Sequence, residues 1–376
     1  MKNLLIISYD FCLEAGGIQN TSYLLAEEFT KFMNVYTLCP ADGHIPNVEK
    51  IKSYRSRYNN TQQERNDYAK DANDIVEKIH LEYHLDYVLV LVWNYSEPAY
   101  RLKEKYGVPY GVLTHGNEVM SFSLKNYLQH PRSYVKLWLK RKRLLNKATH
   151  IFSNTNYTKE LVLNITKETS IYVVHPPINL VPKSKSISQN KNKVILSVGR
   201  IVERKGFQNV IKALPYIIKH IPDIQYIIAG TGKYESELHE LVKKMHLENY
   251  VNIKGRVSEK EKEELLSNCG LFVMPSFVIK GEMEVEGFGV AFLEANINGK
   301  FVISSLSGGI PEAIKEGITG FLVPENDIIG LSNAILKFYS DSFHYCPKDC
   351  VDWAMEHHIS NITKQYYNII CNKINK

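Results

Sequence analysis

The sequence predicts an α/β protein with two Rossmann-like domains, each built on a doubly wound parallel sheet. The chain has 376 residues, more than a single hydrophobic core usually serves, so two domains are expected. Short apolar runs that suit buried strands alternate with helical patterns along the chain. A polar stretch without periodicity, from Lys183 to Asn192, interrupts this alternation. We therefore expect an N-terminal domain over residues 1–180, a linker over 181–192 and a C-terminal domain over 193–352.

The composition is that of an ordinary globular protein, with 44% hydrophobic and 23% charged residues and a net charge of +6. No run of 18 apolar residues is present, so no membrane-spanning helix is expected. The apolar run after Met1 is too short for a signal peptide and suits a first strand. Six scattered cysteines favour reduced thiols over a metal site. These features predict a cytoplasmic protein, with any membrane contact peripheral.

The first predicted unit is a strand from Leu4 to Tyr9, a loop containing Gly16 and Gly17, and a helix from Asn20 to Phe29. This order is typical of the start of a Rossmann-like domain. The loop is not Gly-x-Gly-x-x-Gly, so a dinucleotide site is not supported. A plain strand-to-helix turn remains the alternative to a ligand-binding loop.

A histidine follows one of the next predicted strands. Tyr110 to Thr114 is an apolar strand, and His115 comes directly after it. Ligands of parallel sheets collect at the carboxyl ends of strands, where His115 is expected to lie. A lone histidine is more often structural, so both roles stay open.

A basic amphipathic helix is expected over residues 135–147, where lysines and arginines alternate with leucines and Trp138. Such a helix can lie on an anionic membrane surface. It can equally pack its leucines on its own domain and leave its charges in water. The two interpretations are compatible.

The C-terminal half begins with a strand from Val194 to Val198, followed by Gly199, Arg200 and, five residues later, Lys205. Two cations placed after a strand can clamp a diphosphate, the guanidinium as a fork and the ammonium as a point charge. A solvated basic loop is the alternative. Arg204 is adjacent to Lys205, but the spacing from the next glycine favours Lys205.

Further along, Glu286 precedes the loop Gly287-Phe288-Gly289, which opens a predicted helix from Val290 to Ile297 carrying Glu294. Backbone N–H groups at such a helix start favour an anion. Ionised carboxylates only accept hydrogen bonds, so Glu286 and Glu294 suit the hydroxyls of a sugar. The tail from Trp353 to Ile374 is predicted to be one helix.

The stretch Glu-Gly-Phe-Gly-Val-Ala-Phe-Leu-Glu-Ala, with seven residues between Glu286 and Glu294, resembles the signature of retaining glycosyltransferases of the GT-B fold, family 4. Gly-Arg-x4-Lys-Gly at Arg200 and Lys205 resembles the diphosphate clamp of that family. Thr-His-Gly-Asn-Glu at His115 resembles its histidine element.

The resemblance implies two domains facing each other across a cleft that holds the active site. The N-terminal domain, 1–180, would meet the acceptor, the C-terminal domain, 193–352, would hold the nucleotide sugar, and the C-terminal helix over 353–376 would pack back on the N-terminal domain. It assigns catalytic roles to His115, Arg200, Lys205 and Glu286, with Glu286 facing the donor sugar and Glu294 the ribose. It assigns donor binding to Gly17, Gly230, Arg256, Val257, Gly287, Phe288, Gly289, Val290 and Glu294.

The implied reaction transfers a hexose, with mannose favoured, from a nucleotide diphosphate sugar to a hydroxyl of a glycan or lipid-linked glycan. The acidic run Glu-Met-Glu-Val-Glu and the run Thr-His-Gly-Asn-Glu both resemble members that use GDP-mannose, such as the phosphatidylinositol mannosyltransferases, although UDP-sugars remain open. No aspartate-x-aspartate motif is present, so we expect no metal and no cofactor. Glu286 and Glu294 would touch opposite ends of the donor, unlike a glycosidase pair flanking one bond.

The expected setting is bacterial surface polysaccharide or lipopolysaccharide synthesis. The expected partners are the donor, the acceptor and a possible anionic membrane surface at 135–147; no nucleic-acid module is recognisable. Two alternatives remain: a UDP-sugar 2-epimerase of the same architecture and a non-catalytic carbohydrate-binding protein.

Overall fold

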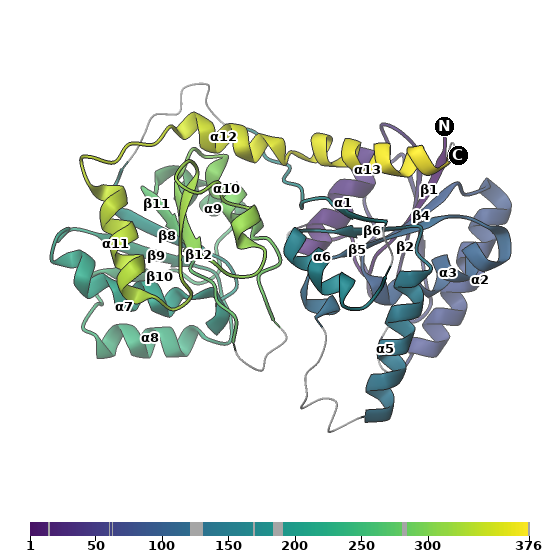
Figure 1. Ribbon diagram of the computed structural model, residues 1–376, viewed down its shortest axis with the longest axis horizontal. Helices are drawn as coiled ribbons and strands as arrows, with labels where there is room; N and C mark the ends of the chain where they lie inside the picture. Colours follow the sequence, from purple (N-terminus) through teal and green to yellow (C-terminus); the bar gives the residue numbers. More distant parts are fainter. Residues whose placement is uncertain are drawn as a thin grey trace. The chain divides into compact units, whose positions relative to one another are not determined.

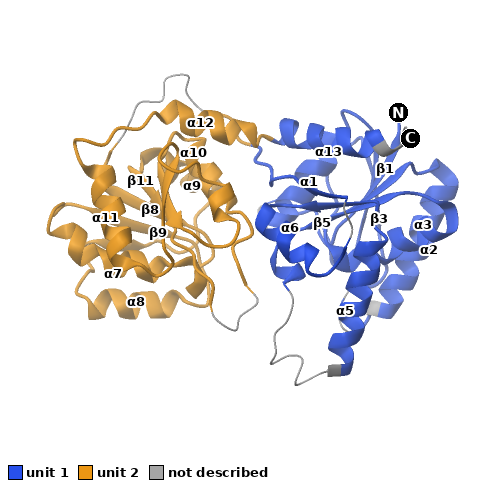
Figure 2. Ribbon diagram, viewed as in Figure 1, with its two compact units in different colours: residues 1–179, 359–376 blue, residues 180–358 orange. Residues whose placement is uncertain are grey.

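The chain divides into two compact units in the computed structural model (Figure 2). Unit 1 comprises residues 1–179 and 359–376, and unit 2 comprises residues 180–358. The structure describes residues 1–13, 16–59, 61, 63–120, 131–167, 170–182, 191–279 and 284–374. Most of the expected linker, 183–190, lies outside the described residues, as do Glu282 and Met283 at the start of the acidic stretch.

Unit 1 is built on a seven-stranded sheet whose neighbouring strands all pair in parallel, in the order β3-β2-β1-β4-β5-β6-β7 (Figure 1). The strands are β1 (Asn3–Ile7), β2 (Asn34–Cys39), β3 (Ile51–Arg55), β4 (Tyr87–Val90), β5 (Tyr110–Thr114), β6 (His150–Ser153) and β7 (Ile171–Val173). The helices are α1 (Gly17–Phe29), α2 (Arg65–Tyr83), η1 (Trp93–Tyr95), α3 (Glu97–Tyr106), η2 (Asn117–Val119), α5 (Pro131–Asn146), α6 (Asn156–Leu163) and α13 (Ile359–Ile374).

Both faces of this sheet are covered, which explains why its central strands are apolar at most positions. In β1, Leu5 and Ile7 join a core cluster with residues of α2, α3, α5 and α6. The alternate residues Leu4 and Ile6 join a second cluster with α1 and α13. Because successive side chains point to opposite faces, one apolar run supplies both layers.

Unit 2 has a six-stranded parallel sheet in the order β10-β9-β8-β11-β12-β13. Its strands are β8 (Val194–Val198), β9 (Gln225–Ala229), β10 (Val251–Ile253), β11 (Leu271–Val273), β12 (Val302–Ser305) and β13 (Gly320–Val323). Its helices are η3 (Glu203–Lys205), α7 (Phe207–Ile218), α8 (Glu235–Lys244), α9 (Glu259–Asn268), α10 (Val290–Asn296), η4 (Ile310–Glu312), α11 (Ile328–Tyr339) and α12 (Pro347–Glu356).

One face of this sheet is covered by α7, α8 and α11, which share a core cluster with its strands. Along α7, Phe207, Val210, Ile211, Leu214 and Ile217 are all fully buried. Each such side chain contributes about 1.5–3 kcal/mol relative to an exposed one, so helical spacing alone fixes the buried side of α7. The expected architecture of two doubly wound parallel sheets is confirmed.

Strand order reverses once in each sheet, between β1 and β4 in unit 1 and between β8 and β11 in unit 2. In open parallel sheets, the loops beyond the carboxyl ends diverge at this switch point and leave a crevice for a ligand. The topology therefore marks one candidate ligand position on each unit.

The expectation of a single helix from Trp353 onward is wrong. Helix α12 begins earlier, at Pro347, and ends at Glu356 in unit 2, whereas α13 begins at Ile359 in unit 1. The backbone N–H of Ile359 donates to the carbonyl of Ile178 at 2.8 Å instead of to a helical carbonyl. This hydrogen bond to the segment after β7 turns the backbone away from the helical path near His357. Of the tail, only residues 359–376 therefore belong to unit 1.

Candidate functional site

Three glycines allow the ends of three strands to pack closely at the carboxyl edge of the unit 2 sheet. A Cβ on Gly230 would lie 2.0 Å from the carbonyl oxygen of Gly199, and the Gly230 N–H donates to the carbonyl of Gly255 at 2.8 Å. Gly230 also has a φ of 137°, which side-chain-bearing residues rarely adopt. A side chain at Gly230 is therefore excluded, and the loops after β8, β9 and β10 lie against one another.

Arg200 follows the first of these glycines and Arg256 the last, and both side chains are exposed, while Val257 is partly buried. Among the described residues, the Arg200 guanidinium makes no hydrogen bond or ion pair with another side chain. An exposed guanidinium without an internal partner keeps all its donors available for an anionic ligand. Its proposed role as part of a diphosphate clamp stays a prediction.

A cluster of paired charges lies beside this edge. Glu286 accepts from Lys205 Nζ at 2.6 Å and from an Arg204 guanidinium nitrogen at 3.0 Å. Arg204 also pairs with Glu284 at 3.2 Å. The side chains of Arg204, Lys205 and Glu286 are only 6%, 12% and 14% exposed, so screening by water is weak.

The cluster fixes the charge of Glu286. Burial raises the pKa of this carboxyl, but Lys205 and Arg204 outweigh burial and hold the pKa at about 2. Glu286 is therefore ionised at neutral pH and can only accept hydrogen bonds. Such a group suits a ligand hydroxyl and repels a ligand phosphate.

The backbone around the cluster is braced at two points. Gly206, with a φ of 76°, would place a Cβ 2.1 Å from the Pro275 carbonyl oxygen, and the N–H of Phe277 donates to the Arg204 carbonyl at 2.8 Å. The Gly309 N–H donates to the Glu286 carbonyl at 2.9 Å. The turn η3, which follows β8, and the loop that follows β11 are thus tied together at the switch point of the unit 2 sheet.

The predicted glycine loop does open a helix, since Gly289 is the residue before α10. Gly289 has a φ of 98°, and a Cβ there would lie 2.4 Å from the ring of Phe292. Phe288 is 2% exposed and its ring lies 5.6 Å from that of His357, which anchors the loop in unit 2. Gly287 and Val290 flank this anchor, both partly exposed.

The second carboxylate has its own cation. Glu294 on α10 lies 3.4 Å from Lys262 Nζ on α9, and Lys262 also pairs with Glu259 at 2.7 Å. Burial lowers the pKa of Lys262, but Glu294 and Glu259 outweigh it and raise the pKa. Glu286 and Glu294 therefore contact different cations on different elements, and do not form one carboxylate pair.

In unit 1, His115 follows β5 as expected, and its ring is held by the main chain. Its Nε2 lies 2.7 Å from the carbonyl oxygen of Leu91, and its backbone N–H donates to Glu118 Oε1 at 2.5 Å. A carbonyl can only accept, so Nε2 carries a proton in this arrangement. Nδ1 makes no hydrogen bond to the part of the chain that the structure describes.

Gly17 is the first residue of α1, and a Cβ there would meet nothing within 4 Å. The fold therefore does not require glycine at this position. Gly17 and His115 lie in unit 1, whereas every other predicted site residue lies in unit 2.

Sequence reasoning missed Glu284 and Lys262 and set Arg204 aside. Arg204 carried a signal, because a second cation stands next to Lys205. Lys262 carried none, since its contact with Glu294 depends on how α9 packs beside α10. Within the described residues, no group of three His, Cys, Asp or Glu side chains is placed to hold a metal ion.

Several basic side chains of helix α5 make hydrogen bonds or ion pairs with other residues of unit 1. Arg141 is 8% exposed and donates to the Glu118 carbonyl at 3.1 Å, and Arg143 pairs with Glu97 at 3.1 Å. Leu144 and Leu145 are fully buried, as the packing interpretation expected. The start of the helix differs, because Val135, Leu137 and Leu139 are 43%, 42% and 53% exposed. Across the described residues, no helix is long and apolar enough to cross a membrane.

Two doubly wound parallel sheets, each with a candidate ligand position at its switch point, define the GT-B class of glycosyltransferase fold. The Anabaena protein HepE in complex with UDP superposes with a TM-score of 0.75 at 18% identity, covering 99% of this chain and 100% of that one. A family model described as Glycosyltransferase Family 4 matches residues 15–181, and one described as Glycosyl transferases group 1 matches residues 182–356. The chain therefore belongs to the family 4 glycosyltransferases.

Two curated relatives align with part of the chain. A GDP-mannose-dependent monoacylated alpha-(1-6)-phosphatidylinositol monomannoside mannosyltransferase of Corynebacterium glutamicum is 34% identical over 166 residues, 43% of each chain. The amylovoran biosynthesis glycosyltransferase AmsK of Erwinia amylovora is 33% identical over 143 residues, 38% of this chain and 35% of the relative. The alignments thus span less than half the length of these relatives.

Proposed function

We propose that the protein is a retaining hexosyltransferase that moves a hexose, with mannose favoured, from a nucleotide diphosphate sugar to a hydroxyl of a glycan or lipid-linked glycan. The observation that carries the proposal is the cluster of Arg204, Lys205 and Glu286 beside the exposed Arg200 at the unit 2 switch point. It combines cations for a diphosphate with an ionised carboxylate for sugar hydroxyls.

The proposed step breaks the bond between the anomeric carbon and the diphosphate oxygen, and the electron pair leaves with the diphosphate. Arg200 and Lys205 stabilise the charge that develops on this leaving group. The acceptor hydroxyl forms the new bond from the face that the diphosphate leaves, and its proton passes to the departing phosphate oxygen. This front-face route accounts for retention without a protein nucleophile.

The remaining predicted residues position the donor. Glu286 accepts hydrogen bonds from the donor sugar, and Glu294, held by Lys262, accepts from the ribose hydroxyls. The main chain around Gly289 faces the diphosphate at the start of α10. We infer a role in donor recognition for His115 of unit 1 as well, with Nδ1 as the ring nitrogen that the bond of Nε2 to Leu91 leaves over. No metal and no cofactor are required, because the two cations do the work of a divalent ion.

The relatives support the preference for mannose and for polysaccharide synthesis. One is named for GDP-mannose and a phosphatidylinositol mannoside, and the other for amylovoran. A 2-epimerase of the same architecture would consume the donor without an acceptor, and a non-catalytic carbohydrate-binding protein would leave it intact. Donor turnover with and without acceptor separates the three.

A thermal-shift screen with EDTA present tests the proposal. The ligands are GDP, UDP, ADP and their common sugar conjugates. A ligand that binds only the folded state stabilises it by about 2.7 kcal/mol at 100 times its dissociation constant. We expect selective stabilisation by GDP and GDP-mannose; a UDP-sugar response would change the donor but keep the mechanism. No response to any nucleotide would overturn the proposed function.

We also propose that the start of α5 contacts an anionic membrane surface, at the cytoplasmic face. Its support is the exposure of Val135, Leu137 and Leu139 next to the lysines of the same helix. Co-sedimentation with phosphatidylglycerol vesicles is expected for the protein and should be lost in Leu137→Ser/Leu139→Ser. The exposed Leu81→Ser serves as the matched control. Equal sedimentation of all three proteins would contradict this contact.

A further inference from the structure

Helix α5 carries a buried cation that makes no ion pair within the described residues. Arg141 is 8% exposed, and its Nη1 donates to the backbone carbonyls of Glu118 at 3.1 Å and of Met120 at 3.4 Å. Its Nε is buried and makes no hydrogen bond to the part of the chain that the structure describes. Buried arginines normally pair with a carboxylate, because an unpaired charge is costly to remove from water. The placement of Arg141 therefore calls for a reason other than stability.

The first carbonyl that Arg141 binds belongs to a residue that also holds His115. Glu118 Oε1 accepts from the His115 backbone N–H at 2.5 Å. The Glu118 carbonyl accepts from Arg141 and, at 2.9 Å, from Trp93 Nε1. Glu118 is thus fixed through its main chain, and it fixes His115 through its side chain. A single residue connects the buried guanidinium to the histidine.

His115 is held at two further points. Its carbonyl accepts from Asn154 Nδ2 at 3.2 Å, and its ring Nε2 donates to the carbonyl of Leu91 at 2.7 Å. Hydrogen bonds weaken steeply when donor and acceptor move out of line, so the ring bond requires the His115 backbone to keep its place. The backbone position in turn depends on Glu118 and Asn154. The orientation of the ring therefore depends on what fixes Glu118.

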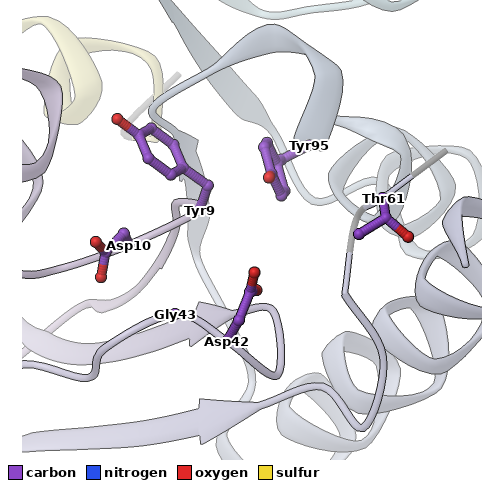
Figure 3. Close-up of a pocket in the computed structure, with 6 residues that line it drawn as sticks. All are labelled: Tyr9, Asp10, Asp42, Gly43, Thr61 and Tyr95. Carbon is purple, nitrogen blue, oxygen red and sulfur yellow. The ribbon is translucent and has the colours of Figure 1, made fainter.

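Trp93 supports the same turn from η1. Its side chain is buried, and the Arg141 guanidinium lies 5.9 Å from the ring centroid, where the π face partly compensates a buried cation. The same short helix η1 carries Tyr95 into a pocket of about 190 Å³ (Figure 3). The residues that line this pocket are Tyr9, Asp10, Asp42, Gly43, Thr61 and Tyr95. Neither Trp93 nor Arg141 is among them, so the two side chains support η1 and η2 without lining the pocket.

The guanidinium suits this supporting position by its shape and its charge. A hydrogen bond from an ionised donor is roughly twice as strong as one between neutral groups. The planar fork of an arginine can reach two carbonyls of one turn, whereas a lysine ammonium is a point charge. Burial lowers the pKa of Arg141, and Tyr134 and Glu118 partly oppose that shift; the guanidinium still carries its charge at neutral pH. A costly arrangement of this kind is typical of places where geometry must be fixed for function.

We propose that Arg141 is a positioning residue for His115. It binds the carbonyls of Glu118 and Met120 and thereby fixes η2. With η2 fixed, the Glu118 carboxylate holds the His115 N–H, and the ring keeps Nε2 on the Leu91 carbonyl and leaves Nδ1 for the donor. The inference rests on the proposed function, in which His115 takes part in donor recognition.

Imidazole ¹⁵N NMR of the full chain, with labelled histidine at mildly alkaline pH, tests the geometry without any substrate. The chain has 13 histidines, and His115→Gln identifies the His115 signal by its loss. We expect the Nε2–H tautomer of His115 in the wild-type protein and a mixture of both tautomers in Arg141→Met. Arg141→Lys, which keeps the charge but not the fork, should give a smaller change. Arg143→Met is the matched control and should give none, since Arg143 lies on the same helix and its partner Glu97 keeps an ion pair with Arg101.

Donor turnover tests whether this geometry matters to the reaction. The substrates are GDP-mannose and UDP-glucose, and the measured quantity is kcat/KM for donor hydrolysis. We expect Arg141→Met and His115→Gln each to lower kcat/KM by at least about fivefold. The double variant should lose no more than His115→Gln alone, because Arg141 acts only through His115. Arg143→Met should stay within about twofold of the wild-type protein.

The two measurements separate this inference from the proposed function. An unchanged His115 tautomer in both Arg141 variants, an equal change in Arg143→Met, or losses of kcat/KM that add in the double variant overturns the positioning role. Arg141→Lys keeps a cation and provides the comparison if Arg141→Met does not fold. If the tautomer responds but no protein turns over a nucleotide sugar, the proposed function fails and the positioning of the ring stands. If turnover is present while the tautomer stays fixed, only the role of Arg141 fails.

Discussion

The two units share a doubly wound parallel sheet but differ at their carboxyl edges. In unit 2 that edge is built from close-packed glycines and from buried ion pairs centred on Glu286. In unit 1 it carries the stacked rings of Tyr9 and Tyr95 beside the carboxylates of Asp10 and Asp42. The buried strands are chemically alike, so the loops alone make the two edges chemically different.

The largest effect on activity is expected at Arg200, on the edge of unit 2. In the proposed mechanism Arg200 stabilises the leaving group, so Arg200→Ala should lower donor turnover about 100- to 1,000-fold. Because the side chain is exposed and has no partner among the described residues, stability should change by less than about 0.5 kcal/mol. Donor hydrolysis and thermal unfolding measure the two effects.

Arg101→Ala is the matched control, since Arg101 is also exposed and its partner in unit 1, the buried Glu97, keeps an ion pair with Arg143. It should leave turnover unchanged. Turnover that falls equally in both variants, or in neither, would show that Arg200 holds no special position at the edge.

The next effect concerns the buried ion pairs of unit 2. Arg204→Met leaves Glu284 and Glu286 with less compensation and should lower the free energy of unfolding by roughly 3 kcal/mol. Lys348→Met removes an ion pair whose side chains are 78% and 57% exposed, so water screens it and the loss of stability should be much smaller. Urea denaturation gives both values. Similar costs for the two variants would remove the distinction between buried and surface charge.

The low pKa of Glu286 predicts a pH dependence of stability. Its pKa is about 2 in the folded protein against an ordinary 4.5, so its stabilising contribution is complete above about pH 4.5 and is lost as the pH falls to about 2. The contribution is roughly 3 kcal/mol. The stability difference between the protein and Glu286→Gln should therefore shrink across that window. A difference that stays constant from pH 6 to pH 2.5 would contradict the ion-pair description.

The smallest effect compares one glycine from each edge. Gly230→Ala forces a Cβ against the Gly199 carbonyl and should lower the free energy of unfolding by about 2 kcal/mol. Gly17→Ala meets no neighbour at a helix start and should raise it by about 0.5 kcal/mol. If Gly17 nevertheless approaches the donor, activity will fall while stability rises. Equal destabilisation by both would mean that the unit 1 edge is as tightly packed as the unit 2 edge.

Much of this organisation could be predicted from the sequence. Apolar runs that end at glycines located the strands and placed Arg200 and His115 at strand ends, because burial on both faces leaves a clear periodic signal. The sequence could not separate the contacts of Arg204 and Lys205, since adjacent residues on a short turn reach the same carboxylate. It could not find Lys262 either, because only the packing of α9 on α10 brings that ammonium to Glu294.

The unit 1 pocket escaped prediction for a similar reason. Asp10, Asp42 and Tyr95 are far apart in the sequence and form no motif, and they converge only because β2, β1 and β4 are neighbours. A usable signal did exist for Asp10, which lies directly after the predicted strand from Leu4 to Tyr9. The helix break at His357 could not be predicted in this way. It depends on a hydrogen bond from Ile359 to Ile178, which is far away in the sequence.

The central claim is that the unit 2 edge holds a nucleoside diphosphate through Arg200. Titration calorimetry with GDP and GMP, or UDP and UMP, on the protein and on Arg200→Ala tests it most directly. We predict that the diphosphate binds at least tenfold more tightly than the monophosphate, about 1.4 kcal/mol, and that Arg200→Ala removes most of this preference. A preference that is absent, or that survives the substitution, would contradict the account.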